Sequence, residues 1–415
     1  MKILWTVNTF NREIASQMGL QSSHAISWVV AMSDYLKNTD VELSIAAPTK
    51  SEKITDKHIN GVHYFAVPHS AECWSQVIDN VKPDVIHEYG TELSHNLLVC
   101  DAAKNIPVIV SLQGILSEYQ RHYYAGIDMS TILRYSPLRD WIIPSGFITG
   151  RKNFIKRSKN EIELLTRVKY VEGRSTWDRV SALKINPGLK YYYCPRMIRR
   201  EFTEADCWNL ENVNRHSILV SQGNYPIKGL HFVFEAVSQL KAQYPDIKIR
   251  IAGNTLFDNI NGAKRFWKTG YIRYLYDLAT KLGIMPNIEF TGSKNSAEMV
   301  ELLNRSHICL VPSAIENAPN SLAEGMVLGV PCIASFVGGN MDMLAHNEQG
   351  FLYCYNEPNM LAEYIKQIFE SDELAKSFSA KARECARERH NPEKLINTLT
   401  GIYDSVIKIG DNGGN

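Results

Sequence analysis

The stretch RSHICLVPSAIENAPNSLAEGMVLGVPCIASFVGGNMDMLAHNEQGF, at residues 305–351, decides the fold. Short continuous apolar runs in it predict buried parallel strands, because such strands are covered on both faces. Gly329 and Pro331 end a helical pattern between these runs. In open α/β sheets ligands bind at the carboxyl ends of the strands, where loops of this kind lie. The predicted elements are a strand at 308–311, a loop at 312–319, a helix at 320–328 and a strand at 332–335.

Two acids in this stretch, Glu316 and Glu324, stand eight positions apart. Glu316 belongs to the loop at the end of the first strand, and Glu324 lies about one turn into the helix, so both can face one side. Taken alone, the two acids favour an ordinary solvated loop residue and helix residue, because most surface acids have no special role. The ordered residues around them are what favour a functional pair.

Composition excludes several classes of protein. The chain has 415 residues, too many for one typical core, so two domains are expected. Apolar residues make up 45% and the formal net charge is +1, which does not indicate a nucleic-acid partner. No run of 18 apolar residues occurs, and the amino-terminal apolar run predicts a buried strand rather than a signal peptide. Eight scattered cysteines without C-x-x-C indicate a reduced, cytoplasmic protein.

Strands and helices alternate along the chain, which predicts an α/β protein with two Rossmann-like, doubly wound parallel sheets. In the first half, strands are expected at 2–7, 41–46, 62–67, 85–87 and 108–112, and helices at 23–37, 72–81 and 93–105. The run VEGRSTWDR at 171–179 is expected to be a strand-to-helix step that closes the first domain. In the second half, further strands are expected at 217–221, 248–252 and 288–290, and helices at 270–282, 296–304, 358–370, 372–389 and 392–408. Prolines 187 and 195 mark a linker at 185–214. Domains are therefore expected at 1–195 and 196–391, and the tail 410–415 is expected to be disordered.

Polar loops in the first half supply candidate substrate-binding residues. His87 and Glu92 belong to the run HEYGTE after one predicted strand, and Gln113 follows the next strand. Gly19 lies in a polar loop after the first strand. Because these loops follow the carboxyl ends of parallel strands, we expect them to line one cleft. Simple capping of the helix at 93–105 by a loop side chain would explain the HEYGTE run equally well.

The second half opens with a glycine-rich loop, QGNYPIKG, at 222–229. Gly223 lets backbone N–H groups approach an anion, the following helix favours negative charge at its start, and Lys228 adds a full positive charge. A loop of this kind is weak as a signal on its own, since many helices begin after glycine and lysine. Asn224 follows the first glycine of the loop.

The ordered set P-S-x-x-E-N-A-P-N-S-L-x-E-G-M-x-x-G-x-P-x-I-A-S-x-x-G-G closely resembles the retaining glycosyltransferases of family 4, which have the GT-B fold. The resemblance is dense over residues 217–352. In the family, an arginine commonly follows the first glycine of the diphosphate-binding loop, where this chain has Asn224. The family also usually has a histidine that contacts the donor sugar where this chain has Gln113, an amide that cannot ionise.

The resemblance implies a role for each candidate residue. Glu316, Lys228 and Gln113 are expected at the reacting centre, with Glu316 on the sugar hydroxyls of the donor. Glu324 is expected to hold the ribose hydroxyls. The donor is expected to be a nucleoside-diphosphate sugar of UDP or GDP type, held by Gly223, Asn224, Lys228, Asn317, Ala318, Ser321 and Glu324. No metal or other cofactor is expected, because no D-x-D motif occurs. The last segment, 392–415, is expected to cross back to the first domain.

The sequence thus predicts a metal-independent, hexosyltransferase-type enzyme that transfers a sugar to a glycan or lipid-linked acceptor. The H-x-x-G-T-E run followed by Q-G also looks like a subgroup that builds capsule and other surface polysaccharides. Aromatic and basic residues at 134–159, including Trp141, Ile142, Ile143, Phe147 and Phe154, suggest a peripheral contact with an anionic membrane, although an ordinary surface helix has the same pattern. Two alternatives stay open: a nucleotide-sugar epimerase of GT-B architecture, and a non-catalytic nucleotide-sugar-binding protein.

Overall fold

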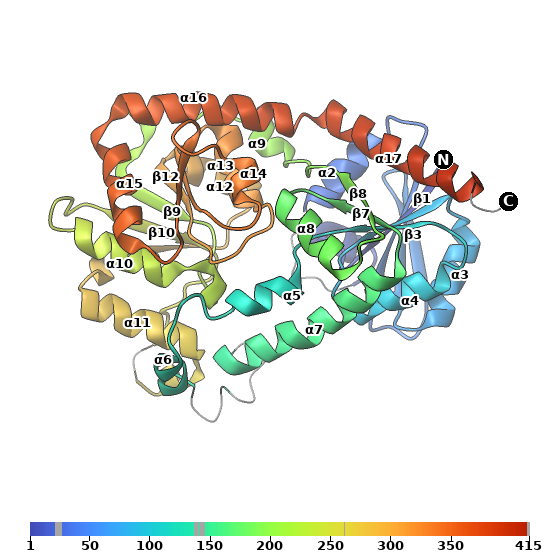
Figure 1. The fold of residues 1–415 in the computed structure, drawn as a ribbon, viewed down its shortest axis with the longest axis horizontal. Coiled ribbons are helices and arrows are strands. Elements are labelled where there is room, and N and C mark those ends of the chain that lie inside the picture. Colours follow the sequence, from blue (N-terminus) through green and yellow to red (C-terminus); the bar gives the residue numbers. More distant parts are fainter. Residues whose placement is uncertain (21–26, 137–139, 141–145, 261, 413–415) are drawn as a thin grey trace. The chain divides into compact units, whose positions relative to one another are not determined.

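A computed structural model describes residues 1–20, 27–136, 140, 146–260 and 262–412 of the protein (Figure 1). The chain forms two compact units, each of which is described by itself below. Unit 1 comprises Met1–Ser117, Lys156–Arg199 and His390–Asn415, and unit 2 comprises Glu118–Ile155 and Arg200–Arg389. The segment 118–155, which the sequence analysis placed in the first domain, therefore belongs with unit 2.

Unit 1 is built on an eight-stranded sheet with the order β3-β4-β2-β1-β5-β6-β7-β8. All neighbouring strands pair in parallel except β3 and β4, which pair antiparallel at the edge. The strands are β1 (Lys2–Val7), β2 (Glu42–Thr49), β3 (Thr55–Ile59), β4 (Val62–Pro68), β5 (Val85–Tyr89), β6 (Val108–Ser111), β7 (Tyr170–Gly173) and β8 (Lys190–Tyr193).

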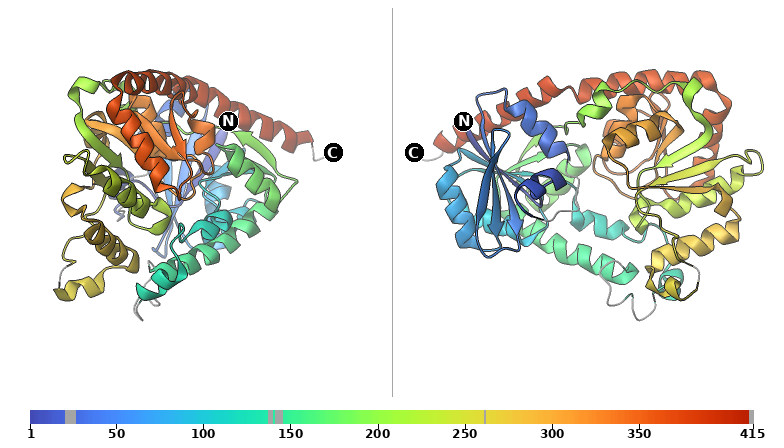
Figure 2. Two further views of the ribbon diagram at one scale, coloured as in Figure 1. Left: turned by 60° about the vertical axis from the view of Figure 1, so that its left-hand side comes forward. Right: turned by 180° about the vertical axis from the view of Figure 1, so that it is seen from behind.

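Helices cover both faces of this sheet, as Figure 2 shows from two sides. Successive side chains of a strand point to opposite faces, so Ile3 and Trp5 belong to one hydrophobic core while Leu4 belongs to the other. The first core is closed by α1 (Arg12–Gln17), α2 (Ser27–Leu36) and α17 (Pro392–Asn412). The second core is closed by α3 (Ala71–Val81), α4 (Ser94–Ala102), α7 (Phe147–Arg167) and α8 (Thr176–Ile185).

Helix α17 brings the end of the chain into unit 1. Its buried residues recur at helical spacing and are Leu395, Ile396, Leu399, Ile402, Tyr403 and Val406. Each fully buried aliphatic side chain of this kind contributes about 1.5–3 kcal/mol of hydrophobic stabilisation. Where α17 begins, His390 Nδ1 donates a hydrogen bond to the carbonyl oxygen of Arg196 at 2.7 Å. This bond ties together the two places where the chain passes between the units, near residues 199 and 389.

Unit 2 contains a six-stranded sheet with the order β11-β10-β9-β12-β13-β14, in which all pairs are parallel. The strands are β9 (Asn214–Val220), β10 (Lys248–Ala252), β11 (Ile288–Gly292), β12 (Ser306–Val311), β13 (Cys332–Ser335) and β14 (Gly350–Tyr353). The helices are α9 (Arg200–Glu204), α10 (Leu230–Leu240), α11 (Gly270–Leu282), α12 (Ser296–Asn304), α13 (Asn320–Leu328), α14 (Asn340–Met343), α15 (Pro358–Glu370) and α16 (Asp372–Arg389). The strand order reverses between β9 and β12, and ligands bind at such switch points in open α/β sheets.

The excursion 118–155 packs against α10 and α11 of unit 2. It contains α6 (Met129–Arg134) and the start of α7. The carbonyl oxygen of Ala125 accepts a hydrogen bond from His231 Nε2 at 3.0 Å, and Tyr135 Oη donates to Asp277 Oδ2 at 2.9 Å. Asp140 Oδ2 accepts from the backbone N–H of Gly270 at 2.7 Å. These bonds join parts of the chain more than a hundred residues apart.

The predicted fold class, two doubly wound α/β domains, is confirmed. The structure differs from the sequence analysis at several elements. Strands β3, β8 and β14 were not predicted, and α1 lies where a loop was expected. The tail expected to be disordered continues α17 to Asn412, and residues 413–415 lie outside the described residues.

Candidate functional site

Two loops of unit 2 meet at the switch point between β9 and β12. The glycine-rich loop contains a 3-10 turn at Pro226–Lys228 and then Gly229, whose φ of +67° is in the left-handed region. A Cβ on Gly229 would lie 2.0 Å from the carbonyl oxygen of Pro312, so only glycine fits between the loops. The backbone N–H of Ala314 donates to the carbonyl oxygen of Ile227 at 2.7 Å. The two loops therefore form one interlocked structure.

Lys228 and Glu316 form an ion pair where these loops meet. Lys228 Nζ lies 2.5 Å from Glu316 Oε1, and the two side chains are only 17% and 10% exposed. Ser313 Oγ donates to the same carboxylate oxygen at 2.7 Å. Each loop thus supplies one charge, and each charge is the partner of the other.

The carbonyl oxygen of Glu316 is held from the opposite side by the turn after β13. The backbone N–H of Gly339 donates to it at 3.1 Å. Gly338 has a φ of +51°, and a Cβ there would lie 1.8 Å from the same oxygen. Ser335 Oγ donates to the carbonyl oxygen of Ser313 at 2.5 Å. The loop that bears Glu316 is therefore held by the turn after β13 and by the side chain of Ser335.

Electrostatics keep Lys228 charged although it is largely removed from solvent. Burial by itself lowers the pKa of Lys228, but the negative charge of Glu316 and the contact with Tyr225 outweigh burial and raise the pKa above its ordinary value. The Nζ atom also lies 5.7 Å from the centre of the Tyr225 ring. Lys228 is therefore a cation beside Glu316, and an ammonium group makes strong charge-assisted hydrogen bonds to phosphate oxygens.

The other predicted donor-side residues lie on the same two loops and on α13. Asn317 is buried, and Ala318 is partly exposed in the loop after Glu316. Glu324 is 9% exposed on α13. Gly223 is buried and Asn224 is exposed in the glycine-rich loop, while Ser321 is partly exposed in the first turn of α13.

The close packing of α13 against the sheet explains the Glu-Gly dipeptide at 324–325. A Cβ on Gly325 would lie 2.8 Å from Cys309 Sγ on β12. A glycine at this position therefore lets the helix approach the strand, and this fixes where Glu324 lies relative to the end of β12.

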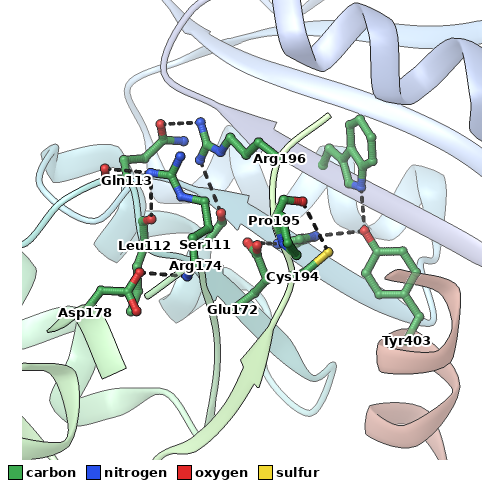
Figure 3. A network of polar contacts seen from close by, with 12 residues as sticks. Ser111, Leu112, Gln113, Glu172, Arg174, Asp178, Cys194, Pro195, Arg196 and Tyr403 are labelled. Carbon is green, nitrogen blue, oxygen red and sulfur yellow. Dashed lines mark hydrogen bonds and ion pairs between the residues drawn. The ribbon is translucent and has the colours of Figure 1, made fainter. Parts of the chain in front are cut away.

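In unit 1, Gln113 lies in a network of buried arginines (Figure 3). Arg196 Nη1 donates to Gln113 Oε1 at 2.8 Å, and Arg174 Nη2 donates to the carbonyl oxygen of Gln113 at 2.9 Å. Arg174 and Arg196 are 7% and 6% exposed. Gln113 itself is partly exposed. The network places Gln113 beyond the ends of β6 and β7, as the sequence analysis expected.

His87 does not have the substrate-facing position that was expected. Strand β5 extends to Tyr89, so His87 lies inside the strand and not in the loop after it. Its side chain is 1% exposed, and its Nδ1 atom is 2.8 Å from Tyr403 Oη on α17. Burial lowers the pKa of His87 despite the nearby Glu172, so the imidazole is neutral at pH 7. His87 joins the sheet to α17 and is not available to a substrate.

Glu92 and Gly19 also differ from the expectation. Glu92 Oε1 accepts from Arg157 Nη2 on α7 at 2.6 Å, and its side chain is 14% exposed. Glu92 thereby connects the loop after β5 to α7, which is a structural role. Gly19 is exposed just after α1 with a φ of +73°, and no atom would lie within 4 Å of a Cβ there. Among the described residues of unit 1, none of the other candidate residues lies against Gly19.

Sequence reasoning missed Arg174 and Arg196, the two cations around Gln113. Both stand in segments that were noted only as a strand-to-helix step and a linker. The run VEGR at 171–174 contained a signal, because a charged residue directly after a buried strand lies at the ligand-binding edge of the sheet. Arg196 gave no such signal, since it follows a proline in a segment expected to be a linker.

Residues 207–385 match the family model of the glycosyl transferases group 1. The match covers most of unit 2 and includes both interlocked loops. Over this region the chain is similar to the group 1 glycosyltransferases, also called family 4. The resemblance stated from the sequence is thus confirmed.

Two relatives illustrate the range of similarity. N-acetyl-alpha-D-glucosaminyl L-malate synthase of Bacillus anthracis is 30% identical over 139 residues, which are 34% of this chain and 36% of that protein. The putative glycosyltransferase YtcC of Bacillus subtilis (strain 168) is 24% identical over 359 residues, 84% of this chain and 79% of its own. The matched region thus spans about a third of the first relative and most of the second.

The fold is similar to that of Anabaena HepE in complex with UDP and glucose. The TM-score is 0.68 at 16% identity, and the match covers 98% of this chain and all of that one. At this identity the similarity concerns the fold alone. Together with the two doubly wound sheets, it shows that the chain has the GT-B fold.

Proposed function

We propose that the chain is a retaining glycosyltransferase that moves a sugar from a nucleoside-diphosphate sugar to a saccharide or lipid-linked acceptor in surface-polysaccharide synthesis. The observation that carries the proposal is the Lys228–Glu316 pair, held by two interlocked loops at the switch point of the unit 2 sheet. The match of residues 207–385 to the family model of the group 1 glycosyltransferases supports the same reading. We assign the donor to this site.

Lys228 is assigned to the diphosphate of the donor. When the bond to the sugar breaks, negative charge develops on the leaving diphosphate and must be stabilised by groups that are already in place. A charge-assisted hydrogen bond from a permanent ammonium group does this better than a neutral donor. The start of α10, directly after Gly229, adds the positive end of a helix dipole.

Glu316 is assigned to the reacting sugar and Glu324 to the ribose. Glu316 accepts from Lys228 and Ser313, so we expect binding of the donor to exchange these partners for groups of the donor. Phosphate oxygens take the place of the carboxylate beside Lys228, and sugar hydroxyls become donors to Glu316. The ion pair therefore keeps both charges satisfied until the substrate arrives, which avoids the cost of leaving a charge buried and unpaired.

We propose that donor binding needs no metal ion, because Lys228 supplies the positive charge. Within the described part of the chain, no group of three or more His, Cys, Asp or Glu side chains is arranged to hold a metal ion. The test is donor binding in the presence of a chelator. Loss of binding that magnesium or manganese restores would contradict the proposal.

We also propose that the exposed side of α7 contacts an anionic membrane. Lys152, Lys156 and Lys159 are exposed and recur at helical spacing, so they lie on one face of the helix. The aromatic residues expected on this surface are not free to contact a membrane. Phe147 is buried, and the ring of Phe154 packs against the ring of Tyr123. Trp141, Ile142 and Ile143 lie outside the described residues. Among the described helices, none is both long and apolar enough to cross a membrane.

Liposome co-sedimentation tests the membrane contact. Each lysine near an anionic surface contributes about 1 kcal/mol before ordering costs. Charge reversal of Lys152, Lys156 and Lys159 should abolish binding to vesicles that contain anionic lipid, and salt should weaken binding of the wild type. Arg151 and Arg157 are poor choices for reversal, since they bond to Gln120 and Glu92 inside the protein. Unchanged sedimentation of the triple variant would overturn the proposal.

The transferase proposal is tested by product analysis with purified protein, a panel of nucleoside-diphosphate sugars and saccharide acceptors. A glycoside whose anomeric configuration matches that of the donor supports the proposal. An altered sugar nucleotide formed without any acceptor would show an epimerase instead. Donor binding without turnover across all acceptors would favour a non-catalytic binding protein.

A further inference from the structure

The side-chain amide of Gln113 has only one orientation that fits its partner. A guanidinium group carries donors and no acceptor, so the atom that faces Arg196 must be the amide oxygen. The amide nitrogen Nε2 then points away from Arg196. It makes no hydrogen bond to any residue in the described ranges, and Gln113 is partly exposed. Gln113 therefore offers two N–H groups to a ligand, while its amide oxygen already accepts from Arg196, so the side chain favours a ligand oxygen that can accept.

Two guanidinium groups, those of Arg174 and Arg196, lie next to Gln113. Both bond to Gln113, Arg196 to its side chain and Arg174 to its backbone, and Figure 3 shows them beside the Gln113 side chain. Burial, and next the charge of Arg174, lower the pKa of Arg196 to about 9 from the ordinary 12.5, although Glu172 acts in the opposite direction. The surroundings of Arg196 thus resist its positive charge, and an added negative charge nearby would relieve that cost.

The position is fixed by the fold and not by flexible side chains. Arg174 follows β7, and its backbone N–H donates to Asp178 Oδ2 on α8 at 2.8 Å. Ser111 Oγ on β6 accepts from Arg196 Nη2 at 3.4 Å. Three neighbouring strands, β6, β7 and β8, thus end around one amide, at the edge of the sheet where ligands bind.

We propose that Gln113, Arg174 and Arg196 form a specificity subsite for an acidic group, a carboxylate or a phosphate, on one of the sugar substrates. Gln113 Nε2 is the contacting donor, and the two arginines supply the positive potential behind it. The proposal rests on the proposed transferase function only in naming a sugar as the ligand. An acidic sugar can enter as the donor, as in a nucleotide-linked uronic acid, or as the acceptor.

A ligand-observed NMR titration of the full chain tests the subsite with D-glucuronate, D-glucose 6-phosphate and D-glucose. A hydrogen bond to a charged group corresponds to roughly a ten- to hundredfold change in affinity. We expect at least one acidic sugar to bind at least tenfold more tightly than glucose. Equal affinity for all three sugars would overturn the proposal.

The variant Gln113→Glu is the most informative change, because it keeps the shape and can still accept from Arg196. It places a negative charge where the ligand anion would lie, so the preference for acidic sugars should be lost while the melting temperature is kept. Arg167→Gln is the matched control: it removes a guanidinium group from the same unit, where Arg167 pairs with Asp101 and Glu163. If Gln113→Glu binds the acidic sugars as tightly as Arg167→Gln does, the subsite does not exist.

Two further measurements show whether the acidic group belongs to the donor or to the acceptor, and whether the donor site of unit 2 exists independently of the subsite. UDP-glucuronate binding more tightly than UDP-glucose would place the acid on the donor, and a preference confined to free acidic sugars would place it on the acceptor. UDP alone reports on unit 2. Binding of UDP or GDP without any acidic preference would overturn the subsite and leave the donor site standing, whereas acidic preference without binding of either nucleotide would do the reverse.

Discussion

A double-mutant cycle on Lys228 and Glu316 examines the reasoning about the ion pair most closely. With side chains 17% and 10% exposed and a separation of 2.5 Å, the pair is largely desolvated. Removing one partner of a buried pair typically costs about 3–5 kcal/mol, mostly because the other charge is left uncompensated. Lys228→Met should therefore lower the free energy of unfolding by about 3 kcal/mol.

Glu316→Gln should cost less, about 1–2 kcal/mol, because the amide oxygen can still accept from Ser313 and the long Lys228 side chain can move toward solvent. The double variant has no unpaired charge at this site, so its free energy of unfolding should fall by no more than that of Lys228→Met. The resulting coupling energy is on the order of 1–2 kcal/mol. Urea unfolding of the four proteins, with equal m-values, measures it. Additivity within about 0.5 kcal/mol would show that the two charges do not depend on each other.

The same variants separate binding from turnover. Lys228→Met removes the cation assigned to the diphosphate, so UDP or GDP should bind more weakly. Glu316→Gln frees Lys228 from its competing carboxylate, so affinity for the free nucleotide should be unchanged or higher, while kcat falls by about a hundredfold. A loss of nucleotide affinity in Glu316→Gln as large as that in Lys228→Met would refute the idea of partner exchange.

Two further predictions concern the structure around the site. Gly229→Ala should lower both the melting temperature and the affinity for nucleotide, because its Cβ would lie 2.0 Å from the Pro312 carbonyl oxygen at a φ of +67°. Differential scanning fluorimetry with and without UDP measures both effects, and wild-type behaviour would contradict this prediction. Burial lowers the pKa of His231 from 6.5 to about 4, so the folded protein favours the neutral imidazole. The contribution of neutral His231 to the free energy of unfolding is complete above pH 6.5 and is lost as the pH falls toward 4. Between pH 7 and pH 5 this histidine should account for about 2 kcal/mol of destabilisation in urea unfolding, and His231→Gln should reduce the pH dependence by that amount; an unchanged dependence would show that His231 does not titrate in this way.

The sequence was most informative where local signals and burial agree. The helix α13 and the strand β13 were predicted at their observed bounds, because Gly329 and Pro331 punctuate apolar runs that are buried on every side. Glu316 and Lys228 were predicted to act together, and they are in contact. Weaker strands such as β8, with the sequence KYYY and partly exposed side chains, have no continuous apolar run to mark them.

Contacts between distant parts of the chain could not be predicted from local pattern. Gln113 and Arg196 are 83 residues apart, and nothing in either segment indicates the other. The excursion 118–155 joins unit 2 through single hydrogen bonds such as that of Ala125 with His231, which leave no periodic signal. His87 was misplaced because the strand was ended two residues early, and this moved a buried side chain into a loop.

The central claim is that the two interlocked loops of unit 2 bind a nucleoside-diphosphate sugar without a metal ion. The most direct measurement is isothermal titration of UDP and GDP into the wild type, Glu324→Ala and Glu316→Gln, with a chelator present. At least one nucleotide should bind the wild type. Glu324→Ala should weaken this binding by about ten- to a hundredfold, the equivalent of a lost charge-assisted hydrogen bond, and Glu316→Gln should not. Absence of binding to the wild type, or full affinity in Glu324→Ala, would show that these loops do not hold the nucleotide as proposed.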